Sequence, residues 1–213
     1  MRWLLNADAL PRWQMPAMLL PALAAAVFAV TAHAQSPAVR HLHGVIEGVT
    51  ADALSLKTEH GDTTSVAITD KTPVVLVSPT SFDAIKPGSY IGTAAVPGAS
   101  GQLRAKEVHV FADKLRGVGE GHTPWPGEPE STMTNGTVGE VTGTGGRTLH
   151  VSYKGGEQTV VVPDDTPVLA MEPGSHAALV PGAHVMVSAT TSSGNSPAAR
   201  FIVVGKDGND PPL

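Results

Sequence analysis

The sequence predicts an all-β protein made of two copies of one small barrel, carried behind a signal peptide. Residues 60–110 align without a gap on residues 154–204, and 14 of the 51 aligned pairs are identical. Val, Thr, Ala, Gly and Pro dominate both copies, a composition typical of short strands and turns. The chain also begins with an apolar segment that ends in small residues, as exported proteins do.

Residues 1–34 have the features of a signal peptide. Met15 to Val30 is an apolar run of 16 residues, shorter than the roughly 20 that a membrane-spanning helix needs. Ala32 and Ala34 are the small residues that a signal peptidase reads, so we expect cleavage after Ala34. The expected location is the periplasm or the medium, with no membrane span after cleavage.

The charge balance argues against nucleic acid and anionic lipid as partners. The chain has 14 Lys and Arg against 19 Asp and Glu, a net charge of −5, and removal of residues 1–34 with Arg2, Arg12 and Asp8 makes it −6. A negative surface disfavours phosphate backbones. The sequence has no cysteine, which excludes disulfides, thiol catalysis and thiolate metal sites.

The first half of each copy predicts three strands. Residues 44–50 form the first, and Leu54 and Leu56 then alternate with polar residues as in a half-buried strand. A turn at Gly61 returns the chain into a third strand at residues 66–68. The second copy repeats these features at residues 136–142, Leu149, Val151, Gly155 and residues 160–162.

The second half of each copy predicts a turn, a short helix and further strands. In the first copy, Thr72 before Pro73 favours extended backbone that leads into a strand. Residues 81–85 can form one helical turn, and the last two strands follow at residues 89–96 and 103–111. His109 alternates with apolar neighbours in the last strand, and we expect it to be exposed.

The compact solution for such a meander is a closed or nearly closed barrel, because closure removes exposed strand edges. We therefore expect two OB-like barrels in tandem. The expected segments are a mature N-terminal segment 35–43, a first barrel 44–111, a Gly- and Pro-rich but ordered linker 112–134, a second barrel 135–205 and a tail 206–213.

Repeated motifs resemble a known family of secreted bacterial proteins. They are Thr72-Pro73-Val74, Ser81 to Ile91 and Ala105 to Val110 in the first copy, and Thr166-Pro167-Val168, Ser175 to Val185 and Ala199 to Val204 in the second. This pattern resembles the family called domain of unknown function 5666, and the segments Arg116 to Trp125 and Ser131 to Asn135 resemble its two-copy subgroup. The resemblance implies exported OB-like barrels and no known activity.

The linker is the first candidate site. It carries Trp125, the only tryptophan outside residues 1–34, and a flexible spacer has no use for a large aromatic side chain. We expect Trp125 to pack in a crevice between the barrels. Glu120, His122, Trp125 and Met133 then form a candidate recognition edge; the alternative is an ordered strap, Arg116 to Thr134, that only fixes the angle between the barrels.

A pair of histidines is the second candidate site. His41 and His43 are separated by one residue, so in a strand both lie on one face and could chelate a divalent metal. Two ligands make a weak site, and no third ligand is fixed by spacing. The tryptophan linker and the histidine pair therefore stand as independent candidates.

Motifs of enzymes are absent from the sequence. It has no G-x-S-x-G, H-E-x-x-H, phosphate-binding loop or dinucleotide fingerprint. The sequence thus favours a non-enzymatic binding or scaffold protein, with a protein or glycan partner in the cell envelope and no cofactor. The alternative is a periplasmic metal-binding or metal-handling protein that uses His41, His43 and His122.

Overall fold

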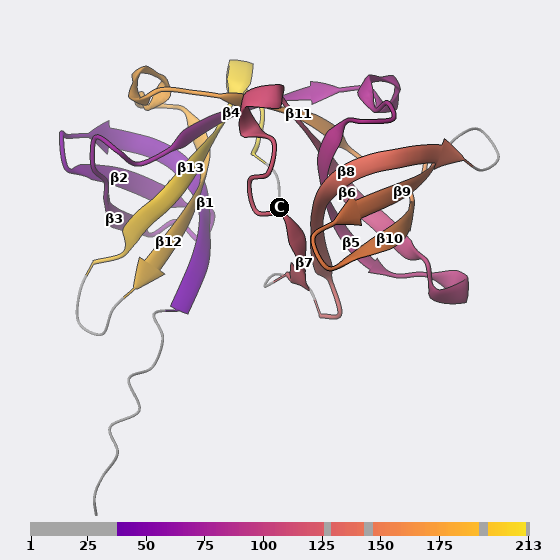
Figure 1. Cartoon of the computed structure of the whole chain (residues 1–213). Coiled ribbons are helices and arrows are strands. Elements are labelled where there is room, and N and C mark those ends of the chain that lie inside the picture. The colour runs from indigo at the N-terminus through magenta and orange to yellow at the C-terminus, as the bar shows by residue number, and fades with distance from the viewer. Residues whose placement is uncertain (1–37, 126–128, 143–146, 192–195, 212–213) are drawn as a thin grey trace, which may run out of the picture. The chain divides into compact units, whose positions relative to one another are not determined.

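A computed structural model describes residues 38–125, 129–142, 147–191 and 196–211. These residues form 13 strands and only short 3-10 helices, so the predicted all-β class is confirmed (Figure 1). In these ranges no helix is long and apolar enough to cross a membrane. The predicted signal peptide, residues 1–34, lies outside the described residues.

Most of the predicted strands are present, together with further ones. The strands are β1 (Ala38–Val49), β2 (Ala53–Thr58), β3 (Thr63–Ala67), β4 (Val74–Thr80), β5 (Tyr90–Pro97), β6 (Leu103–Phe111), β7 (Gly121–Pro124), β8 (Thr132–Thr142), β9 (Thr148–Tyr153), β10 (Gly156–Val161), β11 (Val168–Pro173), β12 (His184–Thr191) and β13 (Ala198–Gly205). The 3-10 helices are η1 (Phe82–Ala84), η2 (Ala99–Gly101), η3 (Asp113–Leu115), η5 (His176–Ala178) and η6 (Lys206–Gly208).

Four strands, β1, β3, β8 and β10, extend further toward the N-terminus than predicted, and one was not predicted at all. β1 begins at Ala38 and β8 at Thr132, because their first halves pair with β12 and β5. The linker contains β7, which pairs with β8 despite its Gly- and Pro-rich sequence. Pro124 fits the outer strand because an edge position needs no backbone N–H donor.

One group of strands, here called lobe I, combines both repeats. β1, β2 and β3 form an antiparallel meander, β12 pairs with β1, and β13 pairs with β12. The parallel pair Ala67 and Ala198 joins β3 to β13 and closes the ring. Figure 1 shows the indigo strands of the N-terminal part beside the orange and yellow strands of the C-terminal part.

The other group, lobe II, has the same pairings with the repeats exchanged. β8, β9 and β10 form the meander, β5 pairs with β8, β6 pairs with β5, and a parallel pair between β10 and β6 closes the ring. The strands of lobe II are consecutive in the chain from β5 to β10, whereas those of lobe I flank them on both sides.

The predicted segments 44–111 and 135–205 therefore do not coincide with the two lobes. Each repeat contributes its first three strands to one lobe and its last two strands to the other. Because both repeats carry the same apolar pattern, either pair of final strands fits either meander. Sequence patterning alone thus predicts the strands without assigning them to a lobe.

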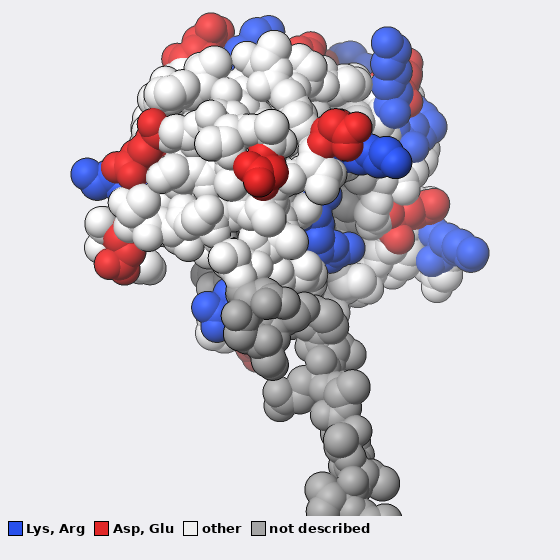
Figure 2. Space-filling model, turned by 90° about the vertical axis from the view of Figure 1, so that its left-hand side faces the viewer, with Lys and Arg blue, Asp and Glu red and all other residues white. Residues whose placement is uncertain are grey.

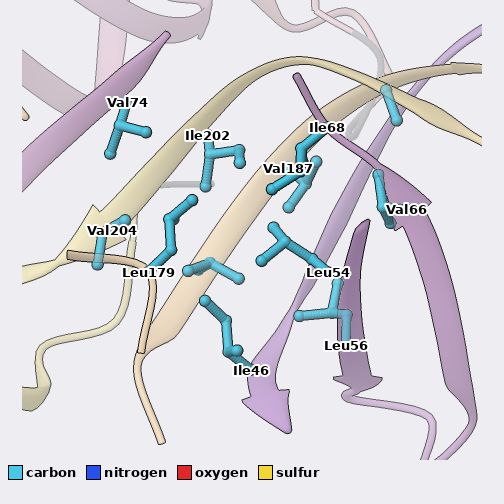
Figure 3. Packing of buried hydrophobic residues seen from close by; sticks show 12 residues of the cluster. Ile46, Leu54, Leu56, Val66, Ile68, Val74, Leu179, Val187, Ile202 and Val204 are labelled. Atoms are coloured by element: carbon cyan, nitrogen blue, oxygen red, sulfur yellow. The ribbon is translucent and has the colours of Figure 1, made fainter. Parts of the chain in front are cut away.

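Each lobe encloses a core drawn from both repeats. The core of lobe I joins Leu54, Leu56 and Val66 of the first repeat to Val187 and Ile202 of the second (Figure 3). The core of lobe II consists of Ile85, Ile91, Ala105, Val108, Val138, Leu149, Val151, Val160, Val162 and Val168. Truncation of one fully buried Leu side chain to Ala costs about 2–5 kcal/mol of stability. Because each core contains residues of both repeats, neither lobe is stable without both.

The strands β4 and β11 connect the lobes and pair antiparallel with each other. Val77 pairs with Met171, which lies 94 residues later and is therefore the equivalent residue of the second repeat. When each residue of a neighbouring pair is replaced by its equivalent in the other repeat, the result is again a pairing of these two strands. The pairing is therefore symmetric about Val77 and Met171. These two side chains form a third buried cluster with Met186 and Val203.

Candidate functional site

The linker is held against lobe II by an added strand. β7 runs antiparallel to the first half of β8, from Gly121 opposite Asn135 to Pro124 opposite Thr132. Beyond β7, the Trp125 N–H donates to the Ser131 carbonyl oxygen at 2.9 Å. The Ser131 hydroxyl donates back to the Trp125 carbonyl oxygen at 3.1 Å. These bonds fix the place at which the Trp125 side chain leaves the linker.

Two predicted binding residues are engaged within lobe II. Glu120 Oε1 accepts the backbone N–H of Lys154 at 3.0 Å. His122 Nδ1 lies 2.8 Å from the hydroxyl oxygen of Thr134, and its ring stacks on Tyr153 with 6.0 Å between centroids and 21° between planes. Glu120 and His122 therefore anchor the linker to the surface of lobe II.

Met133, the third predicted binding residue of the linker, is only 8% exposed. It lies in β8 between Ala94 of β5 and Thr123 of β7. β7 therefore occupies the free edge of this half of β8 beside Met133.

Trp125 and His41 come together, although the sequence placed them in different candidate sites. Their ring centroids lie 4.7 Å apart at 45°, and both residues are half-buried. His41 belongs to β1 of lobe I, so Trp125 carries the linker from lobe II onto the outer face of lobe I. Burial, then His43 and Arg200, lower the pKa of His41 below its ordinary value of 6.5, which favours the neutral imidazole at neutral pH.

His43 lines a groove beside this contact. The groove has a volume of about 340 Å³ and includes Lys57, Glu59, His184 and Asp210. His184 Nδ1 lies 2.6 Å from Asp210 Oδ1, and both groups are substantially exposed. The walls thus combine backbone of β1 and β2 with charges of both signs.

The predicted metal pair gains no third ligand in the part of the chain that the structure describes. No group of three or more His, Asp or Glu residues in those ranges is placed to hold a metal ion. His41 contacts Trp125, whereas His43 belongs to the neighbouring groove. The site therefore gives the metal alternative no support beyond the two adjacent histidines.

The groove and the linker occupy equivalent places in the two lobes, a relation that the sequence analysis missed. Gly44 pairs with Val185 in lobe I as Gly136 pairs with Ile91 in lobe II. Extending the match of residues 44–50 with 136–142 back along the strands makes His43 the counterpart of Asn135, and His41 the counterpart of Met133. That backward extension is the signal that could have revealed the relation.

A buried acid–histidine pair also escaped prediction. His109, expected to be exposed, is 5% exposed, and so is Glu107, whose carboxylate meets its imidazole. The expectation assumed an isolated barrel, whereas in the structure β11 pairs along β6 with Leu169 opposite His109, and the Phe111 ring lies edge-on to the imidazole. Both side chains therefore belong to the interior of the described residues.

Comparison of the chain with protein-family models, with curated proteins and with solved structures found no match. The proposed function therefore rests on the residues of the site. They place a half-buried tryptophan and a histidine face to face where the linker meets β1, next to an open groove with a mixed charge.

Proposed function

We propose that this chain is an exported, non-enzymatic binding or scaffold protein built from two OB-like barrels, one in each lobe. Its interaction surface is formed by the linker around Trp125 and by the outer face of β1. The observation that carries this proposal is the contact of Trp125 with His41. A partly buried aromatic ring is the kind of residue that dominates binding surfaces, and this one contacts the strand whose His43 lines the groove.

The topology of each lobe supports the OB-like assignment. In lobe I a three-stranded meander is followed by two further strands, and a parallel pair between the third and the last strand closes the ring. Lobe II has the same pairings, but its two further strands precede the meander in the chain. A five-stranded, partly open barrel of this kind is typical of OB folds. The resemblance to the secreted family of unknown function agrees with this assignment and is likewise a proposal.

The surface supports a protein or glycan partner over nucleic acid. Figure 2 shows exposed Lys, Arg, Asp and Glu side chains interspersed around a largely uncharged face, without a continuous basic area. Binding of single-stranded nucleic acid needs a basic groove with stacked aromatic side chains. The groove beside His43 instead combines Lys57 with Glu59 and Asp210.

Site-specific photocrosslinking in the producing cells tests the proposed function. A photoreactive phenylalanine analogue replaces His43, and a matched control carries it at Val180, which is 49% exposed. We expect a discrete covalent adduct from position 43 that weakens when Trp125→Ala is added. Absence of an adduct at position 43, or the same adduct at position 180, contradicts the proposal.

A further inference from the structure

We propose that the open edge of β1, residues 40–43, with the groove beside it, binds an extended peptide as an added antiparallel strand. The peptide carries a basic side chain at its N-terminal end. This inference rests on the proposed function of a binding protein and assigns it a site and a ligand class. Addition of a strand to a sheet edge is a common mode of peptide recognition.

The first half of β1 has a partner on one side. β1 pairs with β12 from Ala38 to Val45 but with β2 only from Gly44 onward. On the β2 side, no described strand pairs with residues 40–43. Such an edge presents backbone N–H and C=O groups to a further strand.

Lobe II shows what this kind of edge accepts. β8 pairs with β5 along its first half and with β9 only from Thr137 onward. There, the edge from Thr132 to Asn135 is covered by β7, an extended segment of four residues. Under the repeat relation, a strand that occupies the place of β7 in lobe I faces His43 at its N-terminal end and Arg40 at its C-terminal end.

The contacts that hold the linker beside β8 have open counterparts in lobe I. In lobe II, Tyr90 donates from its hydroxyl to the Val118 carbonyl oxygen at 3.0 Å. Asn135 Nδ2 donates to the Gly119 carbonyl oxygen at 3.2 Å, and the turn at Lys154 donates its N–H to Glu120.

The counterparts of Tyr90, Asn135 and Lys154 are His184, His43 and Glu59. The first follows from the offset of 94 and the second from the β1 match. The third follows from strand register, because Leu56 lies opposite Ile46 as Val151 lies opposite Val138. The gapless alignment instead sets His60, the next residue of the same turn, opposite Lys154. All three counterparts line the groove of about 340 Å³. Lobe I therefore places these three residues along a groove, at the positions that lobe II uses to hold an extended segment, and His184 there contacts Asp210.

The charges define the ligand. Where lobe II has Lys154 at the turn that receives Glu120, lobe I has the exposed residue Glu59. An acidic residue at this place in the ligand is repelled, whereas Lys or Arg is attracted. At the other end, Arg40 stands where β8 has Thr132, which favours an acidic residue near the C-terminal end of the ligand.

A charge-exchange experiment tests this site with the full chain. The probes are two fluorescein-labelled peptides: one copies residues 119–125, and the other carries Glu120→Lys in the same sequence. We expect the Lys peptide to bind about fivefold more tightly in fluorescence anisotropy, in keeping with an exposed charge pair. Glu59→Lys should reverse this preference, while Asp83→Lys, an equal charge change within η1, should leave it intact.

Hydrogen exchange locates the binding. The Lys peptide should slow the exchange of amides at residues 40–43 without changing residues 132–135. The proposal is overturned if neither peptide binds, if the preference ignores Glu59, or if the amides of residues 40–43 that point away from β12 are already protected without peptide because a second copy or another segment covers them. An adduct at position 43 without peptide binding supports the proposed function and overturns this inference. Peptide binding without an adduct supports the peptide site and contradicts the proposed function as the crosslinking tests it.

Discussion

At the scale of single residues, the contact of His41 with Trp125 joins the two halves of the candidate surface. Both residues could be selected from the sequence. Trp125 is the only tryptophan outside residues 1–34, and His41 is separated from His43 by one residue. Their contact could not be predicted, because β1 and the linker belong to different lobes and no local pattern encodes their approach. In this contact each ring shields the other from water, and burial of the imidazole lowers the pKa of His41.

We predict that stability falls on mild acidification through His41. The lowered pKa of His41 means that the unfolded chain binds a proton more readily than the folded one. The free energy of unfolding therefore decreases as the pH falls below the ordinary value of 6.5, and levels off below the pKa of the folded state. Urea unfolding at pH 7.5 and 5 should show a larger loss for the wild type than for His41→Gln. An equal loss in both proteins would assign the pH dependence to other groups.

At the scale of elements, the sequence predicts strands better than it predicts partners. Alternation at Leu54 and Leu56 identifies β2, and the same pattern at Leu149 identifies β9. β7 escapes prediction because its stability comes from pairing with β8 rather than from its own residues. Anchoring side chains at its start and middle add to this pairing.

We predict that His122→Ala loosens β7 without unfolding lobe II. The substitution removes the stack on Tyr153 and the contact with Thr134, worth about 1 kcal/mol together. Amide exchange at residues 121–123 should accelerate about fivefold. His60→Ala, at an exposed turn of lobe I, is the matched control and should leave that exchange unchanged. Equal rates in the wild type and His122→Ala would show that the backbone pairing alone holds β7.

At the scale of the whole molecule, the internal repeat was visible in the sequence, but the exchange of strands was not. Residues 60–110 and 154–204 share their apolar positions, so a closed barrel within each repeat satisfies the pattern as well as the observed arrangement does. The choice depends on the path of β4 and β11, which carry the chain from one lobe to the other and pair there. The cores of both lobes therefore depend on both halves of the chain.

We predict that cutting the chain between the repeats does not separate them. A protease site placed within residues 126–128 should yield two fragments that elute together under native conditions, because β12 and β13 complete lobe I and β5 and β6 complete lobe II. Native mass spectrometry before and after cleavage measures this directly, and denaturant should release both fragments. Dissociation without denaturant would indicate independent barrels within each repeat.

The nesting of lobe II within lobe I also sets an order of assembly. All strands of lobe II lie in one continuous stretch, so this lobe has what it needs once β10 is available. Lobe I must bring β3 to β13 across the whole of that stretch, and closure over a long separation in sequence slows folding. A chain that emerges from its N-terminus therefore keeps the meander of its first three strands without β12 and β13 longest, although these three strands are made first. The first three strands of the two repeats share one sequence pattern, yet those of the second repeat are completed early and those of the first repeat last.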